Sequence, residues 1–327
     1  MKALVFDDVA VASDGYAALA LRDVPVPRLG RGEVLVRMTM AAINPADFMF
    51  MADAYVKSPS LPGQIAGLTG AGVIAEAGDG CTVREGEAVS IWATGSWAEY
   101  AVVPETSLVV LPAGYPQTLA SQFSNLISAA DILDLAGVRP GGWLALTAAQ
   151  STVARIALQL ARARGVRTIA IVRRRKGAPI DGADAVIALE ELEGSLTDAI
   201  RAATSGAPLS GVADCVGGPG CADLLRLCDF RSRVVIFGNL RSEPLGFTAA
   251  DMLIKSCSVL PYAFRFFFEP PTERDRPQID ALVAQSTQPG FTHPVGGIHP
   301  LEDYRAAIDG HATRTDLGKR FFSIAEA

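Results

Sequence analysis

Histidine and cysteine are scarce in this chain of 327 residues, which holds three histidines and five cysteines. All three histidines (His293, His299 and His311) fall near the end of the sequence, and Cys81 is the only cysteine before residue 215. Structural zinc sites use four Cys or His ligands, usually in closely spaced pairs, and the sequence contains no CxxC pair. We therefore expect no metal, and we expect the cysteines to remain reduced and to serve in packing.

Long apolar runs and clusters of positive charge are also nearly absent. No run reaches the roughly 18 apolar residues that cross a bilayer, and the first residues, MKALVFDD, predict a strand rather than a targeting peptide. A formal net charge of −6 argues against nucleic acid as a partner. We expect a cytoplasmic protein that binds neither nucleic acid nor membrane, and its length predicts two domains.

The stretch from Trp143 to Lys176 has the pattern of a strand, a tight turn, an amphipathic helix, a second strand and four consecutive cations. Gly165 stands where a helix C-cap belongs, and helical spacing is followed by Val153, Ile156, Ala157, Leu160 and Ala161. The pattern is that of the first βαβ unit of a dinucleotide-binding domain. An ordinary α/β crossover with a solvated basic strand end is the alternative.

The turn of this unit carries small residues, from Ala149 to Ala154, where G-x-G-x-x-G carries glycine. We predict that Ser151, Thr152 and Val153 present backbone N–H groups to a pyrophosphate at the helix amino terminus. An acidic residue at the end of the second strand would favour NAD, whereas arginine there suits the 2′-phosphate of NADP. That position is held by Arg173, Arg174 and Arg175, so the predicted cofactor is NADPH.

The rest of the chain divides into regions with different sequence patterns. Residues 1–122 show short strands broken by Gly and Pro, which predicts a β-rich, barrel-like domain that resumes over 262–327. Residues 123–261 alternate strands with helices and predict an α/β doubly wound parallel sheet of six strands, a Rossmann domain. Further strands are expected at 184–189, 211–217, 233–238 and 256–260, helices at 195–204, 222–228 and 301–309, and a closing strand at 317–324. We expect the active site in the cleft between the two domains.

This layout resembles the medium-chain dehydrogenase/reductase superfamily, which joins a GroES-like catalytic domain to a Rossmann domain. The run Asn44-Pro45-Ala46-Asp47, then Tyr55, then LPGQIAGLTGAGVIAEAG, is similar to the zinc-free quinone and enoyl reductases. Zinc-dependent relatives carry G-H-E where this chain has Gly67-Leu68-Thr69. AAQSTVA and IVRRR resemble the AANSGVG and VVRxR of mitochondrial-type trans-2-enoyl thioester reductases.

The resemblance implies NADPH-dependent reduction of the conjugated C=C bond of a 2-enoyl thioester carried by coenzyme A or acyl carrier protein. Tyr55 would stabilise the enolate oxygen or pass a proton, and Asn44 would orient the substrate or the nicotinamide. Ser128 would lie near the nicotinamide, and Phe237, Gly238 and Asn239 near its ribose. The superfamily also implies a homodimer, with a small molecule or an acyl thioester as substrate.

Several alternatives stay open. The protein could be a quinone or enone reductase, or a non-catalytic nucleotide-binding protein. Tyr55 could serve only in packing, Asn44 in a turn, and Asp47 or Ser128 in helix capping. The aromatic run at 262–268 could line an acyl channel or belong to the core or an interface. Two departures from the enoyl reductases stand out: Ala154 in place of the third turn glycine, and Ala263 where a pocket tryptophan is common.

Overall fold

The computed structural model describes residues 1–9, 17–175, 179–313 and 317–325. Two compact units divide the chain. The first contains residues 1–124, 266–290 and 294–327, and the second contains residues 125–265 and 291–293. Each unit is described by itself. No helix among the described residues is long and apolar enough to cross a membrane.

The first unit is built on a seven-stranded sheet, in which β15, β16, β3, β5, β6 and β8 follow in this order and β7 pairs with β3. A second sheet has the order β2-β1-β4. The strands are β1 (Lys2–Phe6), β2 (Ala20–Asp23), β3 (Glu33–Ala42), β4 (Gln64–Ile65), β5 (Gly70–Ala77), β6 (Ala88–Ile91), β7 (Tyr100–Pro104), β8 (Leu108–Val110), β15 (Val295–Pro300) and β16 (Lys319–Ser323). The predicted β-rich front of the chain and its closing strand are confirmed, because β16 pairs antiparallel with β3.

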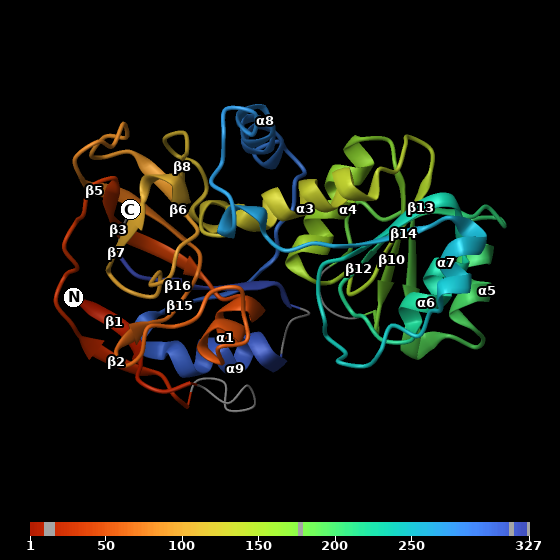
Figure 1. Cartoon of the computed structure of the whole chain (residues 1–327), viewed down its shortest axis with the longest axis horizontal. Helices are drawn as coiled ribbons and strands as arrows, with labels where there is room; N and C mark the ends of the chain where they lie inside the picture. The colour runs from red at the N-terminus through yellow and green to blue at the C-terminus, as the bar shows by residue number, and fades with distance from the viewer. Residues whose placement is uncertain (10–16, 176–178, 314–316, 326–327) are drawn as a thin grey trace. The chain divides into compact units, whose positions relative to one another are not determined.

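Helices α1 (Pro45–Met51) and α9 (Tyr304–Thr313) lie side by side, below β15 and β16 in Figure 1. The unit also contains α2 (Gln117–Ala120) and α8 (Arg276–Ser286), while α3 (Phe123–Ala136) runs from the first unit into the second. The sequence patterns predicted neither α8 nor β15. The predicted helix at 301–309 instead begins with a 3-10 turn at 301–303 and continues as α9.

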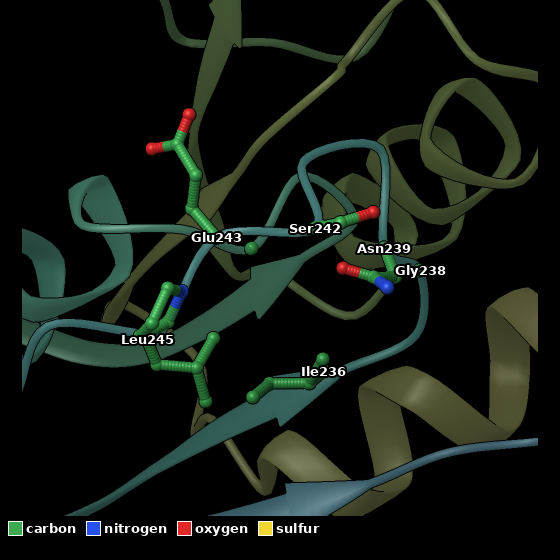
Figure 2. A pocket seen from close by; sticks show the side chains of 8 residues that line it. Ile236, Gly238, Asn239, Ser242, Glu243 and Leu245 are labelled. Carbon is green, nitrogen blue, oxygen red and sulfur yellow. The ribbon is translucent and has the colours of Figure 1, made fainter.

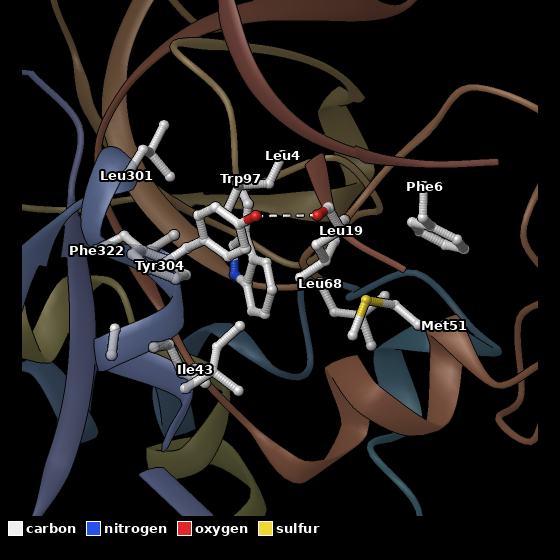
Figure 3. Packing of buried hydrophobic residues seen from close by; sticks show 14 of the residues in the cluster. Leu4, Phe6, Leu19, Ile43, Met51, Leu68, Trp97, Leu301, Tyr304 and Phe322 are labelled. Carbon is white, nitrogen blue, oxygen red and sulfur yellow. Dashed lines mark hydrogen bonds between the residues drawn. The ribbon is translucent and has the colours of Figure 1, made fainter. Parts of the chain in front are cut away.

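The core of the first unit joins residues from both ends of the chain. Trp97 and Phe322 pack edge to face with ring centroids 5.0 Å apart. Tyr304 contributes its ring to the same cluster and donates its hydroxyl proton to the carbonyl of Leu19 at 3.0 Å (Figure 3). A buried Tyr hydroxyl with a partner adds apolar area without leaving a polar group unsatisfied. This core therefore fixes α9 and β16 beside α1.

The second unit is a parallel sheet of six strands in the order β11-β10-β9-β12-β13-β14. Its strands are β9 (Trp143–Leu146), β10 (Arg167–Val172), β11 (Ala185–Ala188), β12 (Leu209–Asp214), β13 (Cys228–Ile236) and β14 (Ser258–Pro261). Helix α4 (Thr152–Ala163) covers one face, and α5 (Leu196–Ala203), α6 (Gly220–Arg226) and α7 (Ala249–Lys255) cover the other (Figure 1). The doubly wound sheet predicted from the sequence is confirmed.

Some predicted boundaries are wrong. The helix predicted to reach Cys228 ends at Arg226, because Cys228 already pairs with Leu209 as the first residue of β13. The same strand ends at Ile236, two residues before the predicted end. The aromatic run at 262–268 is partly core: Phe266 is 6% exposed and stacks on Trp92 at 5.4 Å, whereas Phe268 is 61% exposed.

Candidate functional site

The candidate site in the first unit is built at the start of α1. Asn44 is the N-cap residue, Pro45 follows it in the first turn, and Asp47 completes a capping box. The carboxylate of Asp47 accepts hydrogen bonds from the N–H of Asn44 at 2.6 Å and from the N–H of Leu68 at 2.8 Å. The capping role considered for Asp47 is therefore confirmed, although its side chain is fully buried.

Asn44 links Asp47 to a buried cation. Its Oδ1 accepts a hydrogen bond from Nζ of Lys319, and its Nδ2 donates to the hydroxyl of Thr69 at 3.0 Å. Lys319 is 6% exposed. Burial raises the pKa of Asp47 and lowers the pKa of Lys319, while the attraction between the two charges opposes both shifts. The Asn44 amide thus serves as the bridge of a buried acid–base pair.

Tyr55 lies in the loop after α1, packed against the core cluster. Its ring meets the ring of Phe267 edge to face, with centroids 5.9 Å apart. Burial, and to a smaller extent the charge of Asp47, raises the pKa of Tyr55 to about 12. A tyrosine phenol is already protonated at neutral pH, and it can donate a hydrogen bond.

The histidines of the first unit have partners other than metal. His311 stacks on Phe48 with centroids 5.8 Å apart, and burial, with Lys319 and Arg320 nearby, lowers its pKa to about 3. His299 Nε2 lies 2.9 Å from a guanidinium nitrogen of Arg320. Over the described part of the chain, no group of three or more His, Cys, Asp or Glu side chains is placed to hold a metal ion.

In the second unit, the turn before α4 has the features of a phosphate site. Ala148 adopts a left-handed conformation with φ of 45°, which is unusual for a residue with a Cβ. The N–H of Ser151 donates to the carbonyl of Ala148 at 2.8 Å. The hydroxyl of Ser151 is buried and has no hydrogen-bond partner among the described residues.

The phosphate prediction therefore needs one correction at Ser151. Because its N–H is used within the turn, the group that Ser151 can offer to a phosphate is its hydroxyl. Thr152 and Val153 begin α4, where N–H groups have no acceptor within the helix. Ala154, in place of the third glycine, is fully buried.

The predicted 2′-phosphate site lies where β10 ends. Arg173, Arg174 and Arg175 are all exposed. Arg173 forms an ion pair with Glu190 at 3.6 Å, and Arg175 forms one with Glu191 at 3.4 Å. The fourth predicted cation, Lys176, lies outside the described residues.

A cavity of about 430 Å³ opens beyond the carboxyl ends of β12 and β13. Figure 2 shows Ile236 and Leu245 on one side of it, and the polar Asn239 and Ser242 on another. Gly238 lines the cavity and is required there, because a Cβ would lie 2.6 Å from the carbonyl oxygen and Sγ of Cys215. Of the residues predicted to lie near the nicotinamide ribose, Gly238 and Asn239 line this cavity, and Phe237 is tied by its N–H to Asp214 at 2.9 Å.

Ser128 lies within α3 and is 8% exposed, so the alternative that it caps a helix is wrong. The Ser128 hydroxyl lowers the pKa of Tyr262, against the larger opposite effect of burial. The hydroxyl of Tyr262 also donates to Asp131 at 3.1 Å, and the same carboxylate oxygen accepts from Arg265 at 2.9 Å. Burial raises the pKa of Tyr262.

The sequence patterns did not predict two members of the hydrogen-bonded networks described above, Asp131 beside Tyr262 and Lys319 beside Asn44. Asp131 could have been found, because residues i and i+3 of a helix share a face and Ser128 was already a candidate. Lys319 carried a weaker signal, a cation beside the apolar residues of a predicted strand. Its buried partner Asn44 is 275 residues away in the sequence, and no local pattern connects them.

Comparison with known families agrees with both units. The alcohol dehydrogenase GroES-like domain matches residues 30–113, and the zinc-binding dehydrogenase family matches residues 152–275, which together make up more than half of the chain. The chain belongs to the medium-chain dehydrogenase/reductase superfamily. Its GroES-like unit carries Tyr55 and Asn44, and its Rossmann unit carries the phosphate turn and the arginines.

Several proteins similar to this chain are reductases. The mitochondrial enoyl-[acyl-carrier-protein] reductase of Xenopus tropicalis is 28% identical over 90% of this chain and 88% of its own length. Prostaglandin reductase-3 of Bos taurus is 33% identical, but over 43% of this chain and 38% of its own. Among solved structures, the quinone oxidoreductase of Thermus thermophilus has a TM-score of 0.78 at 24% identity, over 99% of this chain and all of its own.

Proposed function

We propose that this medium-chain reductase uses NADPH to reduce the conjugated C=C bond of a 2-enoyl thioester carried by coenzyme A or acyl carrier protein. The observation that carries the proposal is Tyr55, a neutral phenol in the loop after α1 that packs against the core cluster and edge to face on Phe267. The similarity to enoyl-[acyl-carrier-protein] reductases over 90% of the chain supports the same substrate class.

The residues of the Rossmann unit fit NADPH. The unpartnered, buried hydroxyl of Ser151 and the first turn of α4 suit a pyrophosphate. Arg173, Arg174 and Arg175 suit the 2′-phosphate, because a planar guanidinium donates paired hydrogen bonds to phosphate oxygens. Gly238 and Asn239 would lie near the nicotinamide ribose. When bound, NADPH supplies the hydride that the β-carbon of the substrate accepts.

The chain itself must stabilise the negative charge that develops on the thioester carbonyl oxygen and supply a proton to the α-carbon. Tyr55 can donate a hydrogen bond to that oxygen because its phenol is protonated. The side-chain amide of Asn44 is hydrogen bonded to Thr69 and Lys319, which favours a structural role for this residue. We place Asn44 as a positioning residue that holds the start of α1.

The test gives purified protein NADPH with crotonyl-CoA in one assay and with a small quinone in another. We expect faster NADPH oxidation with crotonyl-CoA. Tyr55→Phe should slow thioester reduction by about 10²- to 10⁴-fold, the usual range for an acid–base group, while Tyr100→Phe, a half-buried tyrosine of β7, should not. An unchanged rate for Tyr55→Phe would remove the phenol from the mechanism.

A quinone or enone reductase is the second candidate, favoured by the likeness to quinone oxidoreductase structures, including a mycobacterial one with a TM-score of 0.80 at 20% identity. Faster oxidation with the quinone would support it. A non-catalytic nucleotide-binding role is the third, and failure to bind NADPH at millimolar concentration would leave no support for either reductase.

A further inference from the structure

The turn after β11 lies against the three arginines that follow β10. The two strands pair in parallel, with Val172 opposite Ala188. Beyond the pair, the N–H of Glu190 donates to the carbonyl of Arg173 at 2.9 Å. Parallel strands end at the same edge of a sheet, so the register itself brings the 3-10 turn Leu189–Glu191 beside the arginines.

Glu190 and Glu191 bind two of the three arginines. Glu190 contacts Nε of Arg173 at 3.6 Å. Glu191 contacts Nε of Arg175 at 3.4 Å and also accepts the N–H of Arg175 at 3.1 Å. Arg175 donates in addition to the carbonyl of Val186 at 2.8 Å. Within the described chain, Arg174 is the one arginine of the three without an ion pair.

These ion pairs are exposed, since the side chains of Arg173 and Glu190 are 72% and 52% accessible and those of Arg175 and Glu191 are 62% and 51% accessible. Exposed ion pairs are weak and exchange partners readily. A dianionic phosphate can therefore displace the carboxylates, but it must then remain close to two negative charges. Like charges a few ångströms apart repel even near a protein surface.

We propose that Glu190 and Glu191 are specificity-determining residues that compete with the 2′-phosphate of the cofactor for Arg173 and Arg175. Three guanidinium groups opposed by two carboxylates leave a smaller net positive charge than the arginines alone. The preference for NADPH over NADH is then smaller than three arginines would give, and it increases when the carboxylates are neutralised. This inference rests on the proposed use of NADPH.

The proposal is specific to ligands with a 2′-phosphate. A nucleotide without that group places no charge at the arginines, so its affinity should not depend on Glu190 or Glu191. The pair 2′,5′-ADP and 5′-AMP isolates the effect, because both lack the nicotinamide and neither needs a substrate. Glutamine keeps the shape of glutamate and an oxygen that can accept the Arg175 N–H.

The experiment measures 2′,5′-ADP and 5′-AMP binding by calorimetry for the wild type, Glu190→Gln, Glu191→Gln and the double variant. Glu193→Gln is the matched control. Glu193 is an exposed residue two positions beyond Glu191, and its substitution by glutamine removes the same charge. We expect each single variant to bind 2′,5′-ADP about 3- to 10-fold more tightly, as expected for one nearby charge. Affinity for 5′-AMP should be unchanged, and Glu193→Gln should stay within about twofold of the wild type.

The inference is overturned if Glu190→Gln and the double variant bind 2′,5′-ADP no more tightly than Glu193→Gln. Equal tightening of 5′-AMP would also overturn it, because the effect would then not concern the 2′-phosphate. A wild type that binds neither NADPH nor 2′,5′-ADP would remove the proposed cofactor and this inference together. Inactivity toward crotonyl-CoA with the expected binding changes would instead remove only the proposed substrate.

Discussion

Lys319 and Asp47 are the residues of the first unit whose charges are most strongly buried, and Asn44 joins them, because its side-chain Oδ1 accepts from Lys319 and its backbone N–H donates to Asp47. We expect Lys319→Met to destabilise the protein by about 3–5 kcal/mol at pH 8, the usual cost of leaving a buried charge without its partner. The reason is that Asp47, fully removed from water, must then either keep its charge without a partner or bind a proton, which costs more free energy as the pH rises. Urea unfolding measures the change.

The loss of unfolding free energy caused by Lys319→Met should depend on pH. Burial raises the pKa of Asp47 well above its ordinary value, and loss of Lys319 removes an opposing charge, so the folded state holds the proton more tightly than the unfolded chain. The cost of Lys319→Met is then smaller at pH 5 than at pH 8. The double variant Lys319→Met/Asp47→Asn should recover part of the loss. An equal cost at both pH values would contradict the buried pair.

A separate prediction for the first unit concerns how the stability of the protein changes when Tyr55 titrates. Its pKa is raised from 10.0 to about 12, so the folded state keeps the phenol protonated at a pH where the unfolded chain has released the proton. The stability that this burial contributes is complete below pH 10 and is lost as the pH rises toward 12. The difference in phenolate absorbance between the wild type and Tyr55→Phe measures the titration. A tyrosine signal that disappears in the variant and titrates below pH 10 would show that Tyr55 is not buried in this way.

Among the elements, α4 and α5 both have a serine as the N-cap residue, but the two serine hydroxyls make different contacts. Ser195 caps α5, with its hydroxyl accepting the N–H of Asp198 at 3.1 Å. Ser151 precedes α4 and makes no such bond. We expect Ser151→Ala to change stability by less than about 1 kcal/mol, because no cap is lost, and to weaken NADPH binding about tenfold through the loss of a donor to phosphate.

Ser195→Ala is the control for that prediction. It should cost about 1 kcal/mol of stability through the lost cap and leave the NADPH dissociation constant unchanged. Thermal unfolding and NADPH fluorescence titration on the two variants give the comparison. If Ser151→Ala loses stability as Ser195→Ala does and binds NADPH normally, the hydroxyl has a structural role alone.

For the whole molecule, we propose a homodimer formed through the outer edge of the six-stranded sheet. β14 pairs with β13 alone among the described strands, and the neighbouring α7 exposes Leu253 and Ile254 at 78% and 76%. Large exposed apolar side chains beside an open strand edge mark association surfaces. Leu253→Glu/Ile254→Glu should give a monomer by sedimentation equilibrium, and Val110→Glu, 38% exposed at the end of β8, should not. A monomeric wild type would contradict the proposal.

The sequence predicted the Rossmann sheet well because its signals are local. Helical spacing from Val153 to Ala161, and Gly165 in the left-handed conformation after α4, mark one helix without reference to the rest of the chain. The boundaries of α6 and β13 were predicted less well, because pairing of Cys228 with Leu209 across the sheet decides where the strand begins.

By itself, the sequence determined the type and order of most elements, the position of the turn before α4 and the run of three arginines. Only the tertiary structure decided that Glu190 and Glu191 form ion pairs with two of those arginines, that Lys319 reaches Asn44, and that Phe267 packs on Tyr55. The physical reason is that periodicity and capping act over a few neighbouring residues, whereas desolvation, ion pairing and ring packing depend on distances between residues that folding brings together.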